Sequence, residues 1–172
     1  FYIQKRNLRQ YNTTIGANVL GYVAEVNRSN LEKDNYYSQG DIIGKQGVEL
    51  SYEKYLRGEK GIKFIQKDRF NRDIGSFNDG LNDINSIAGN DLTITIDSEL
   101  QEYGELLMSN KKGAIVAIEP SSGELLTLVS APSYNPNLLV GRERSKNYFE
   151  LYQDSIYKPL LDKGLISTFP AG

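Results

Sequence analysis

The sequence predicts an α+β fold in two parts. Residues 48–56 carry the apolar spacing of an amphipathic helix, whereas residues 114–118 and 125–129 are apolar runs of strand length. Between these regions, residues 78–90 are rich in Asn, Asp, Gly and Ser, a composition typical of linkers and long loops. We therefore expect one module over residues 1–89 and a second over residues 90–172.

Composition limits the chemistry that the chain can perform. The 172 residues carry a net charge of −2, which argues against a surface for nucleic acid. The chain has no Cys and no His, so it lacks the usual zinc ligands, disulfides and any Ser-His-Asp triad. We expect no cofactor and no metal. No apolar run approaches the roughly 20 residues that span a bilayer.

The first module should begin with short elements. Residues 17–26 predict a helical turn followed by a strand, and Ser29 is placed to cap a short helix that runs through Tyr37. A further helix follows, with four residues on one face, and Gly58 should end it in the left-handed conformation. The residues of that face are Val48, Tyr52, Tyr55 and Leu56.

The end of the first module reads as a hairpin and a loop. Residues 62–70 and 74–77 predict two strands around Asn71-Arg72-Asp73. The loop at residues 78–90 contains Asn-Asp-Gly-Leu-Asn-Asp, which suggests calcium. It lacks the Glu that closes an EF-hand loop, so we favour a plain turn.

The second module should open with a strand and a helix. Residues 92–96 alternate as a strand does, and Asp97 or Ser98 can cap the helix that follows. Ser98 with Gln101 matches a capping box. Leu100, Tyr103 and Leu107 should form the buried stripe of that helix, although Gly104 weakens it.

A hairpin and a loop-rich region complete the second module. The strands at residues 114–118 and 125–129 are apolar on both faces, which predicts a sheet covered on both sides. The intervening Glu-Pro-Ser-Ser-Gly is a turn sequence. Beyond it, residues 132–162 read mostly as loop, with a short helix over residues 146–152.

Serine and lysine are the remaining candidates for nucleophilic chemistry. Ser-x-x-Lys occurs three times, as Ser51/Lys54, Ser109/Lys112 and Ser155/Lys158. One helical turn would put each amine beside its hydroxyl. A structural explanation is better for each pair. Ser51 and Lys54 lie on the polar face of a predicted helix, and Ser109 and Lys112 lie at a helix end. Lys158 precedes a proline, which disfavours helix there. Ser76-Phe77-Asn78 has the form Ser-x-Asn, but we assign it to a turn.

Four segments resemble class B penicillin-binding proteins, in the same order along the chain. Residues 40–61 (GDIIGKQGVELSYEKYLRGEKG) and 92–107 (LTITIDSELQEYGELL) match two of their signatures. Residues 113–137 are similar to the hairpin that opens their transpeptidase domain, and residues 144–172 to the stretch that follows it. The Gly44-Lys45-x-Gly47 element and residues 144–148 resemble the elongation-specific members.

The resemblance implies a modular organisation. Residues 1–89 would be the later part of the non-catalytic pedestal, or dimerisation, domain. Residues 90–172 would be the truncated start of a β-lactamase-like α/β sandwich. The family's catalytic Ser-x-x-Lys would begin immediately after Gly172, so no catalytic residue is expected within the chain. Asp162-Lys163-Gly164 and Phe169-Pro170-Ala171-Gly172 depart from the family's usual Asn-Arg-Ala and Tyr-Pro-Pro-Gly.

The resemblance also implies the activity and partners of the parent protein. It would be a serine D,D-transpeptidase that acts on D-Ala-D-Ala stem peptides and is acylated by β-lactams. An N-terminal anchor would hold it on the periplasmic face of the membrane, beside a SEDS-type glycosyltransferase and other elongation-complex proteins. The fragment itself should be inactive and open to self-association. Three alternatives stay open: a non-catalytic scaffold, a division-specific member, and a serine β-lactamase or penicillin sensor, which the pedestal signature disfavours.

Overall fold

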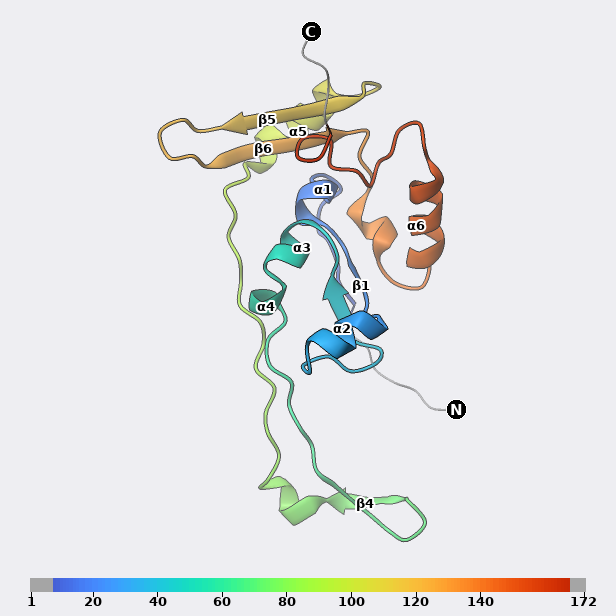
Figure 1. Cartoon of the computed structure of the whole chain (residues 1–172). Coiled ribbons are helices and arrows are strands. Elements are labelled where there is room, and N and C mark those ends of the chain that lie inside the picture. Colours follow the sequence, from blue (N-terminus) through green and yellow to red (C-terminus); the bar gives the residue numbers. More distant parts are fainter. Residues whose placement is uncertain (1–7, 168–172) are drawn as a thin grey trace. The chain divides into compact units, whose positions relative to one another are not determined.

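The computed structural model describes residues 8–167 (Figure 1). They divide into two compact units. The first contains the residues up to 51 together with those from 94 onward, and the second contains Tyr52–Thr93. Short helices and three antiparallel sheets of two strands each confirm the α+β class over the described part of the chain. None of the helices over residues 8–167 has the length and hydrophobicity that crossing a membrane requires.

The first unit opens as predicted. Helix α1 (Ala17–Leu20) ends at Gly21, and strand β1 (Val23–Glu25) follows. Strand β1 pairs antiparallel with β2 (Ile42–Gly44), after which the chain enters helix α3 (Gly47–Ser51). Gly21 and Gly47 allow the two chain segments to touch: a Cβ on Gly21 would lie 1.8 Å from the Gln46 carbonyl oxygen.

Helix α2 (Arg28–Lys33) corrects the predicted cap. Asn27, and not Ser29, is the N-cap, and its side chain accepts a hydrogen bond from the Asn30 backbone N–H at 2.9 Å. In turn, the side-chain oxygen of Asn30 accepts a hydrogen bond from the Asn27 backbone N–H at 3.1 Å. Because this box sets the start of the helix two residues earlier, Ser29 lies inside the helix. The helix also ends at Lys33 rather than Tyr37.

The amphipathic helix predicted over residues 48–56 is interrupted. Helix α3 stops at Ser51, and α4 (Glu53–Leu56) begins after Tyr52, whose φ of −111° and ψ of 19° are not helical. The interruption coincides with the boundary between the two units. The predicted end is confirmed, because Gly58 follows the C-cap with a φ of +69°.

The second unit is a narrow antiparallel structure. Strands β3 (Ile65–Lys67) and β4 (Asp73–Ser76) form the predicted hairpin, and a 3-10 turn, η1 (Phe77–Gly80), follows. The prediction of a loop over residues 78–90 is wrong for its second half. There, Ile84 forms a backbone bridge with Ile62, and Ile87 forms one with Glu59. A set of glycines permits this approach, since a Cβ on any of them would meet a backbone oxygen at 2.7 Å or less: Gly58, Gly61 and Gly89.

Helix α5 (Ser98–Leu107) begins at Asp97, whose carboxylate accepts from the Leu100 N–H at 2.9 Å. The Ser98–Gln101 capping box is therefore wrong. The strand predicted at residues 92–96 is wrong too, as that stretch has no strand pairing. The Thr95 hydroxyl instead donates to the Leu125 carbonyl oxygen at 2.7 Å, so a side chain replaces the backbone ladder.

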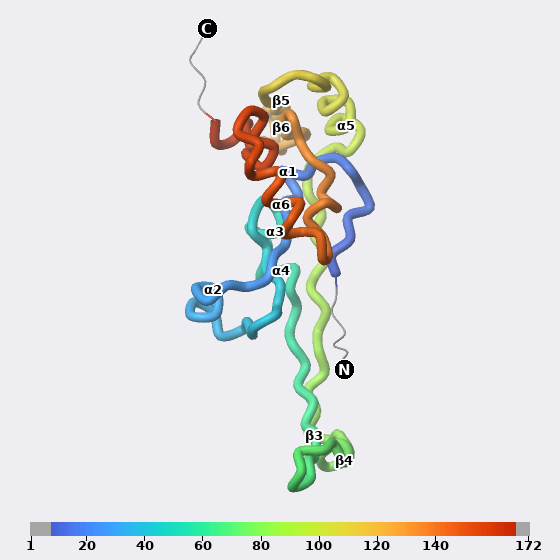
Figure 2. Tube along the Cα trace, turned by 90° about the vertical axis from the view of Figure 1, so that its right-hand side faces the viewer, coloured from blue at the N-terminus to red at the C-terminus, as the bar shows by residue number. Residues whose placement is uncertain are grey.

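The buried face of α5 differs from the predicted one. Leu100, Tyr103 and Leu107 are 36%, 57% and 45% exposed, whereas Gln101 and Gly104 are buried. A Cβ on Gly104 would come within 2.8 Å of a Val129 methyl group. The missing side chain thus lets the helix backbone approach the hairpin, beside which α5 lies in Figure 2.

The predicted second hairpin is confirmed. Strands β5 (Gly113–Ile118) and β6 (Leu125–Ala131) pair antiparallel, and the turn between them closes on Gly123, with a φ of +78°. Strand β6 is mostly buried, but Val116 and Ile118 of β5 remain 46% and 57% exposed. The sequence predicts a hairpin that is covered on both sides. Among the described residues this prediction is wrong, because one side of β5 is left exposed.

The C-terminal region packs against the start of the first unit. A 3-10 turn, η2 (Pro136–Leu139), precedes helix α6 (Arg144–Gln153), which is longer than the predicted residues 146–152 (Figure 1). Ala17, Tyr134 and Leu139 form a small core, and Tyr22 and Tyr148 pack on it.

Candidate functional site

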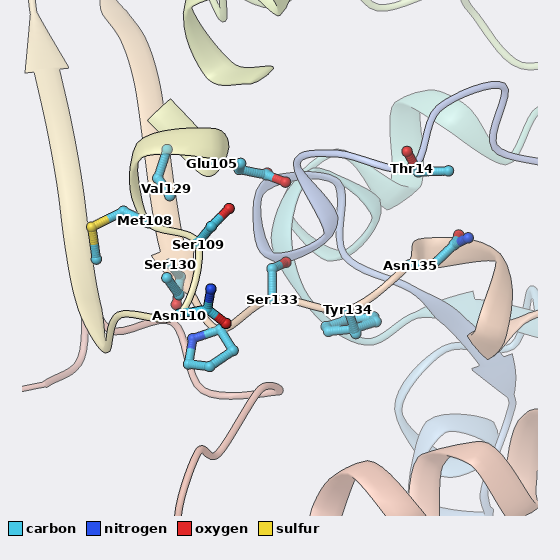
Figure 3. A pocket seen from close by; sticks show the side chains of 12 residues that line it. Thr14, Glu105, Met108, Ser109, Asn110, Val129, Ser130, Ser133, Tyr134 and Asn135 are labelled. Atoms are coloured by element: carbon cyan, nitrogen blue, oxygen red, sulfur yellow. The ribbon is translucent and has the colours of Figure 1, made fainter. Parts of the chain in front are cut away.

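A surface cavity of about 310 Å³ lies where the C-terminal end of α5 faces the segment after β6 (Figure 3). Polar side chains dominate its lining, including Glu105, Ser109, Asn110, Ser133 and Asn135. Glu105 is engaged already, because its carboxylate accepts from the Gly16 N–H at 2.7 Å and from Gln101 Nε2 at 3.1 Å. The lining can hydrogen-bond a small polar molecule, but it brings together no nucleophile and base.

None of the three Ser-x-x-Lys pairs has a catalytic arrangement. Ser51 ends α3, and Lys54 lies in the separate helix α4. Lys112 Nζ donates to the Ile156 carbonyl oxygen at 2.6 Å, which directs the amine away from Ser109. Lys158 has a φ of +46°, so Ser155 and Lys158 do not share a helical turn. None of the three matches therefore places an amine beside its hydroxyl on one helical turn.

A buried anchor joins residues 158–166 to strand β6. The Ser130 hydroxyl donates to the Leu161 carbonyl oxygen and accepts from the Lys163 N–H, both at 3.0 Å. Lys163 is 3% exposed, and its Nζ donates to the Lys158 carbonyl oxygen at 3.1 Å. Burial, together with the nearby charge of Lys112, lowers the pKa of the Lys163 amine.

Asp162 completes this anchor. Its Oδ1 accepts from the N–H groups of Gly164 and Leu165, at 2.9 and 3.2 Å, and so shapes the turn that follows. A Cβ on Gly164 would lie 2.7 Å from a Leu128 methyl group, so the turn presses closely on β6. The predicted lead-in to the nucleophile, residues 168–172, lies outside the described residues.

A second polar network ties the N-terminal segment to α3. Glu49 is 7% exposed, and its carboxylate accepts from Arg9 Nη2 at 2.8 Å and from the Tyr11 hydroxyl at 3.2 Å. Burial and the adjacent Glu49 charge raise the pKa of Tyr11. The Asn137 side chain holds the same segment, through the backbone N–H and carbonyl of Tyr11. Glu49 is thus a structural carboxylate, with a fixed arginine partner.

Tyr134 should make the free energy of unfolding of the first unit depend on pH in the alkaline range. Its side chain is 6% exposed, and burial, with a smaller effect from Tyr148, raises the pKa of the phenol to about 12. In the unfolded chain the phenol ionises near pH 10.0. Its contribution to stability is therefore complete below pH 10 and is lost as the pH rises toward 12, a change of about 2–3 kcal/mol.

Tyr134→Phe should reduce the loss of unfolding free energy as the pH rises above about 10. The Tyr134 hydroxyl is buried and has no hydrogen-bond partner among residues 8–167. We therefore expect the variant to be at least as stable as the parent chain at pH 7. Urea unfolding of both proteins between pH 7 and about pH 11.5 measures the difference, because the other titrating groups are common to both. Parallel stability curves over this range would contradict the assignment.

Comparison with protein families identifies the chain. The model of the penicillin-binding protein dimerisation domain matches residues 1–94, more than half of its length. The chain belongs to the penicillin-binding protein family. The resemblance of its segments to this family is thereby confirmed.

Individual relatives agree with the family. The penicillin-binding protein chain is 37% identical to a peptidoglycan D,D-transpeptidase MrdA from Acinetobacter baumannii, over 91% of its own length and 23% of the relative's. Penicillin-binding protein 2 from Helicobacter pylori, solved in complex with MreC, is 36% identical, with a TM-score of 0.73 over 90% of this chain and 28% of that one.

A third neighbour comes from a peptidoglycan synthase complex that coordinates polymerization and crosslinking. It is 28% identical, with a TM-score of 0.70 over 94% of this chain and 30% of that one. The penicillin-binding protein chain thus spans about a quarter of the length of the curated relatives that it matches.

Sequence reasoning missed the buried polar residues of the penicillin-binding protein chain. Gln101, Glu49 and Lys163 are each less than 10% exposed, yet none carries an apolar pattern. For Gln101 a signal did exist, since it lies three residues before Gly104, on the same helical face. Lys163 has no such signal, because its two backbone acceptors depend on the tertiary fold.

Proposed function

We propose that this chain is part of a peptidoglycan D,D-transpeptidase that cross-links stem peptides during cell-wall elongation. The observation that carries the proposal is co-linearity: a relative named as such an enzyme aligns with 91% of the chain. The Gly44-Lys45-x-Gly47 element and residues 144–148 favour the elongation enzyme over the division enzyme.

The chemistry belongs to a serine that we place immediately after Gly172, with its lysine three residues further on. The serine hydroxyl attacks the D-Ala-D-Ala peptide bond and releases D-Ala, which leaves an acyl-serine ester. An amine of a second stem peptide then attacks the ester, forms the cross-link and restores the hydroxyl. β-Lactams acylate the same serine.

The described residues support the elements that precede this nucleophile. Residues 158–166 are held on β6 by the hydrogen bonds of Ser130 to Leu161 and Lys163, and Asp162 shapes the turn at Gly164 within this segment. A nucleophile needs such a rigid support, because a small displacement of the reacting atom slows an enzyme considerably. The boundary between pedestal and transpeptidase parts lies, in this proposal, at residues 89–90.

Labelling with a fluorescent penicillin tests the proposal. The chain of 172 residues should take up no label, whereas a protein that continues past Gly172 into Ser-x-x-Lys should be labelled. Replacing that serine by alanine should abolish the label. Covalent labelling of the chain alone, lost after heat denaturation, would contradict the placement of the nucleophile.

The membrane and its partners complete the proposal. An N-terminal anchor would hold the parent on the periplasmic face of the cytoplasmic membrane, beside a SEDS-type glycosyltransferase. Two neighbours, one solved with MreC and one in a peptidoglycan synthase complex, support contacts with elongation-complex proteins. The same neighbours favour a second role for the pedestal, as a non-catalytic scaffold. Pull-down of the glycosyltransferase by residues 1–89 alone would separate that role from the catalytic one.

The uncovered hairpin supports the proposed self-association of the fragment. Strand β5 exposes Val116 and Ile118, and apolar side chains on a strand with a free edge favour pairing between chains. Sedimentation velocity should show a mass that rises with concentration. A strictly monomeric chain at high concentration would contradict this part of the proposal.

A further inference from the structure

Two cations lie on the same side of the first unit. Lys45 is directly opposite Tyr22, one position beyond the β1–β2 pair of Val23 and Gly44, and its N–H donates to the Tyr22 carbonyl oxygen at 2.9 Å. Residues that face each other across an antiparallel pair project their side chains to the same face. Lys45 and Tyr22 are therefore neighbours on one face of this two-stranded sheet.

Helix α6 brings the second cation to this face. The ring of Tyr22 packs on that of Tyr148, with centroids 5.6 Å apart and an interplanar angle of 50°. Arg144 lies one helical turn before Tyr148, on the same side of α6. Lys45 and Arg144 therefore lie on either side of the packed Tyr22–Tyr148 pair. Burial, together with the positive charge of Arg144, lowers the pKa of Lys45.

No carboxylate neutralises this pair within residues 8–167. Lys45 Nζ donates to the amide oxygen of Asn30 at 2.9 Å. The Arg144 guanidinium makes no hydrogen bond or ion pair with any of residues 8–167. Several other arginines of the described chain do have a carboxylate partner: Arg9, Arg28, Arg57 and Arg72. The chain has 22 acidic and 20 basic residues, so it is not short of acids that could have filled this place.

An aromatic stripe adjoins the two cations. Arg144, Tyr148 and Tyr152 follow one another at intervals of four on α6. The rings of Tyr148 and Tyr152 are stacked, 6.1 Å apart, and Tyr152 is 69% exposed. Tyr148 is half-buried, so Tyr152 is the exposed tyrosine of the stripe. A tyrosine beside an arginine is typical of the surfaces on which protein partners dock, since the pair combines a large apolar area with polar contacts.

We propose that Lys45 and Arg144, with the tyrosine stripe of α6, form a binding site for an acidic polypeptide segment of a partner protein. A carboxylate of that segment lies between the ammonium and the guanidinium, and an apolar group beside it packs on Tyr148 and Tyr152. The carboxylate relieves the repulsion between the two cations, and the stripe selects a polypeptide over a small inorganic anion.

Titration of the full chain with an acetylated, amidated hexaglutamate peptide tests this site. In about 50 mM NaCl, amide NMR signals of Tyr22, Lys45 and Arg144 should shift in a saturable way, and hexaglutamine should shift none of them. Arg144→Gln and Lys45→Gln should each weaken binding about tenfold, as expected for the loss of a charge-assisted hydrogen bond. Raising the salt to about 200 mM should weaken binding in the parent chain.

Lys146→Gln is the matched control. Lys146 is an exposed cation of the same helix, two residues from Arg144 and therefore on another side of it. Its loss should leave hexaglutamate binding within about twofold of the parent chain. An equal loss in all three variants would show nonspecific charge attraction and overturn the proposal.

Inorganic phosphate distinguishes a polypeptide site from a general anion site. If phosphate shifts the same signals at the same concentration as hexaglutamate, the site does not select a polypeptide over a small anion and the proposal is wrong. Absence of any saturable shift with hexaglutamate would also overturn it. Because the hexaglutamate and phosphate titrations are followed in the unmodified chain, this comparison does not depend on the folding of any variant, nor on the proposed transpeptidase activity.

Discussion

Gln101→Met is expected to lower the free energy of unfolding by about 3 kcal/mol. Gln101 is 2% exposed and sits between α5 and β6. Its Oε1 accepts from the Leu128 N–H at 2.9 Å and from the Thr127 hydroxyl at 2.6 Å. Its Nε2 donates to the Leu128 carbonyl oxygen at 3.0 Å. One side chain therefore satisfies three buried polar groups of a single strand.

Methionine has nearly the same volume, so the variant removes these hydrogen bonds without opening a cavity. The Leu128 N–H and carbonyl would stay buried without this partner, and each such group costs about 1–3 kcal/mol. Urea unfolding followed by circular dichroism measures the loss. Glu102→Met, at the exposed neighbouring position, is the control and should change stability by less than about 0.5 kcal/mol. Equal effects of the two substitutions would show that the contact with β6 is not what stabilises α5.

The same residue shows why the sequence predicts the elements better than their packing. The existence of α5 follows from local signals, namely the cap at Asp97 and the helix-favouring residues after it. Which face of α5 is buried depends instead on Gly104, whose missing side chain allows the helix backbone to approach Val129. Hydrophobic periodicity counts glycine as a weakness of the helix, and so it assigns the buried face to Leu100, Tyr103 and Leu107, all of which are exposed.

The turns are more predictable than the strands, because a turn depends on the conformational preference of single residues. Gly58 and Gly123 have the positive φ values that the sequence predicts, because few other residues take up this conformation. Residues 92–96 alternate as a strand does, but a strand also needs a partner with free backbone groups. The Thr95 hydroxyl and the Asp97 N–H already bond to the backbone oxygens of Leu125 and Leu126, so the ladder does not form.

The candidate site also combines features that the sequence predicts with features that depend on the folded structure. The segments that resemble the penicillin-binding proteins could be read directly, since the family match depends only on residue order. The anchor of residues 158–166 on β6 could not, because Ser130 and Lys163 are 33 residues apart and meet only in the folded chain.

Gly47→Ala is expected to have the largest effect on the first unit, a loss of about 4 kcal/mol or outright unfolding. Gly47 has a φ of +60°, and a Cβ at this position would lie 2.3 Å from the Val19 carbonyl oxygen. Two costs therefore combine. The left-handed conformation costs a non-glycine residue about 1–2 kcal/mol, and the contact with backbone would force α1 and α3 apart.

Gly141→Ala separates these two costs. Gly141 has a similar φ, +73°, but a Cβ there would have no atom within 4 Å. It should therefore show only the conformational cost of about 1–2 kcal/mol. Thermal and urea unfolding of both variants give the difference, which measures the close approach of α1 to the Gly44-Lys45-x-Gly47 element. If both variants lose the same stability, backbone conformation alone accounts for Gly47. If Gly47→Ala loses much more, the second glycine of this element is required because it lets two backbones touch.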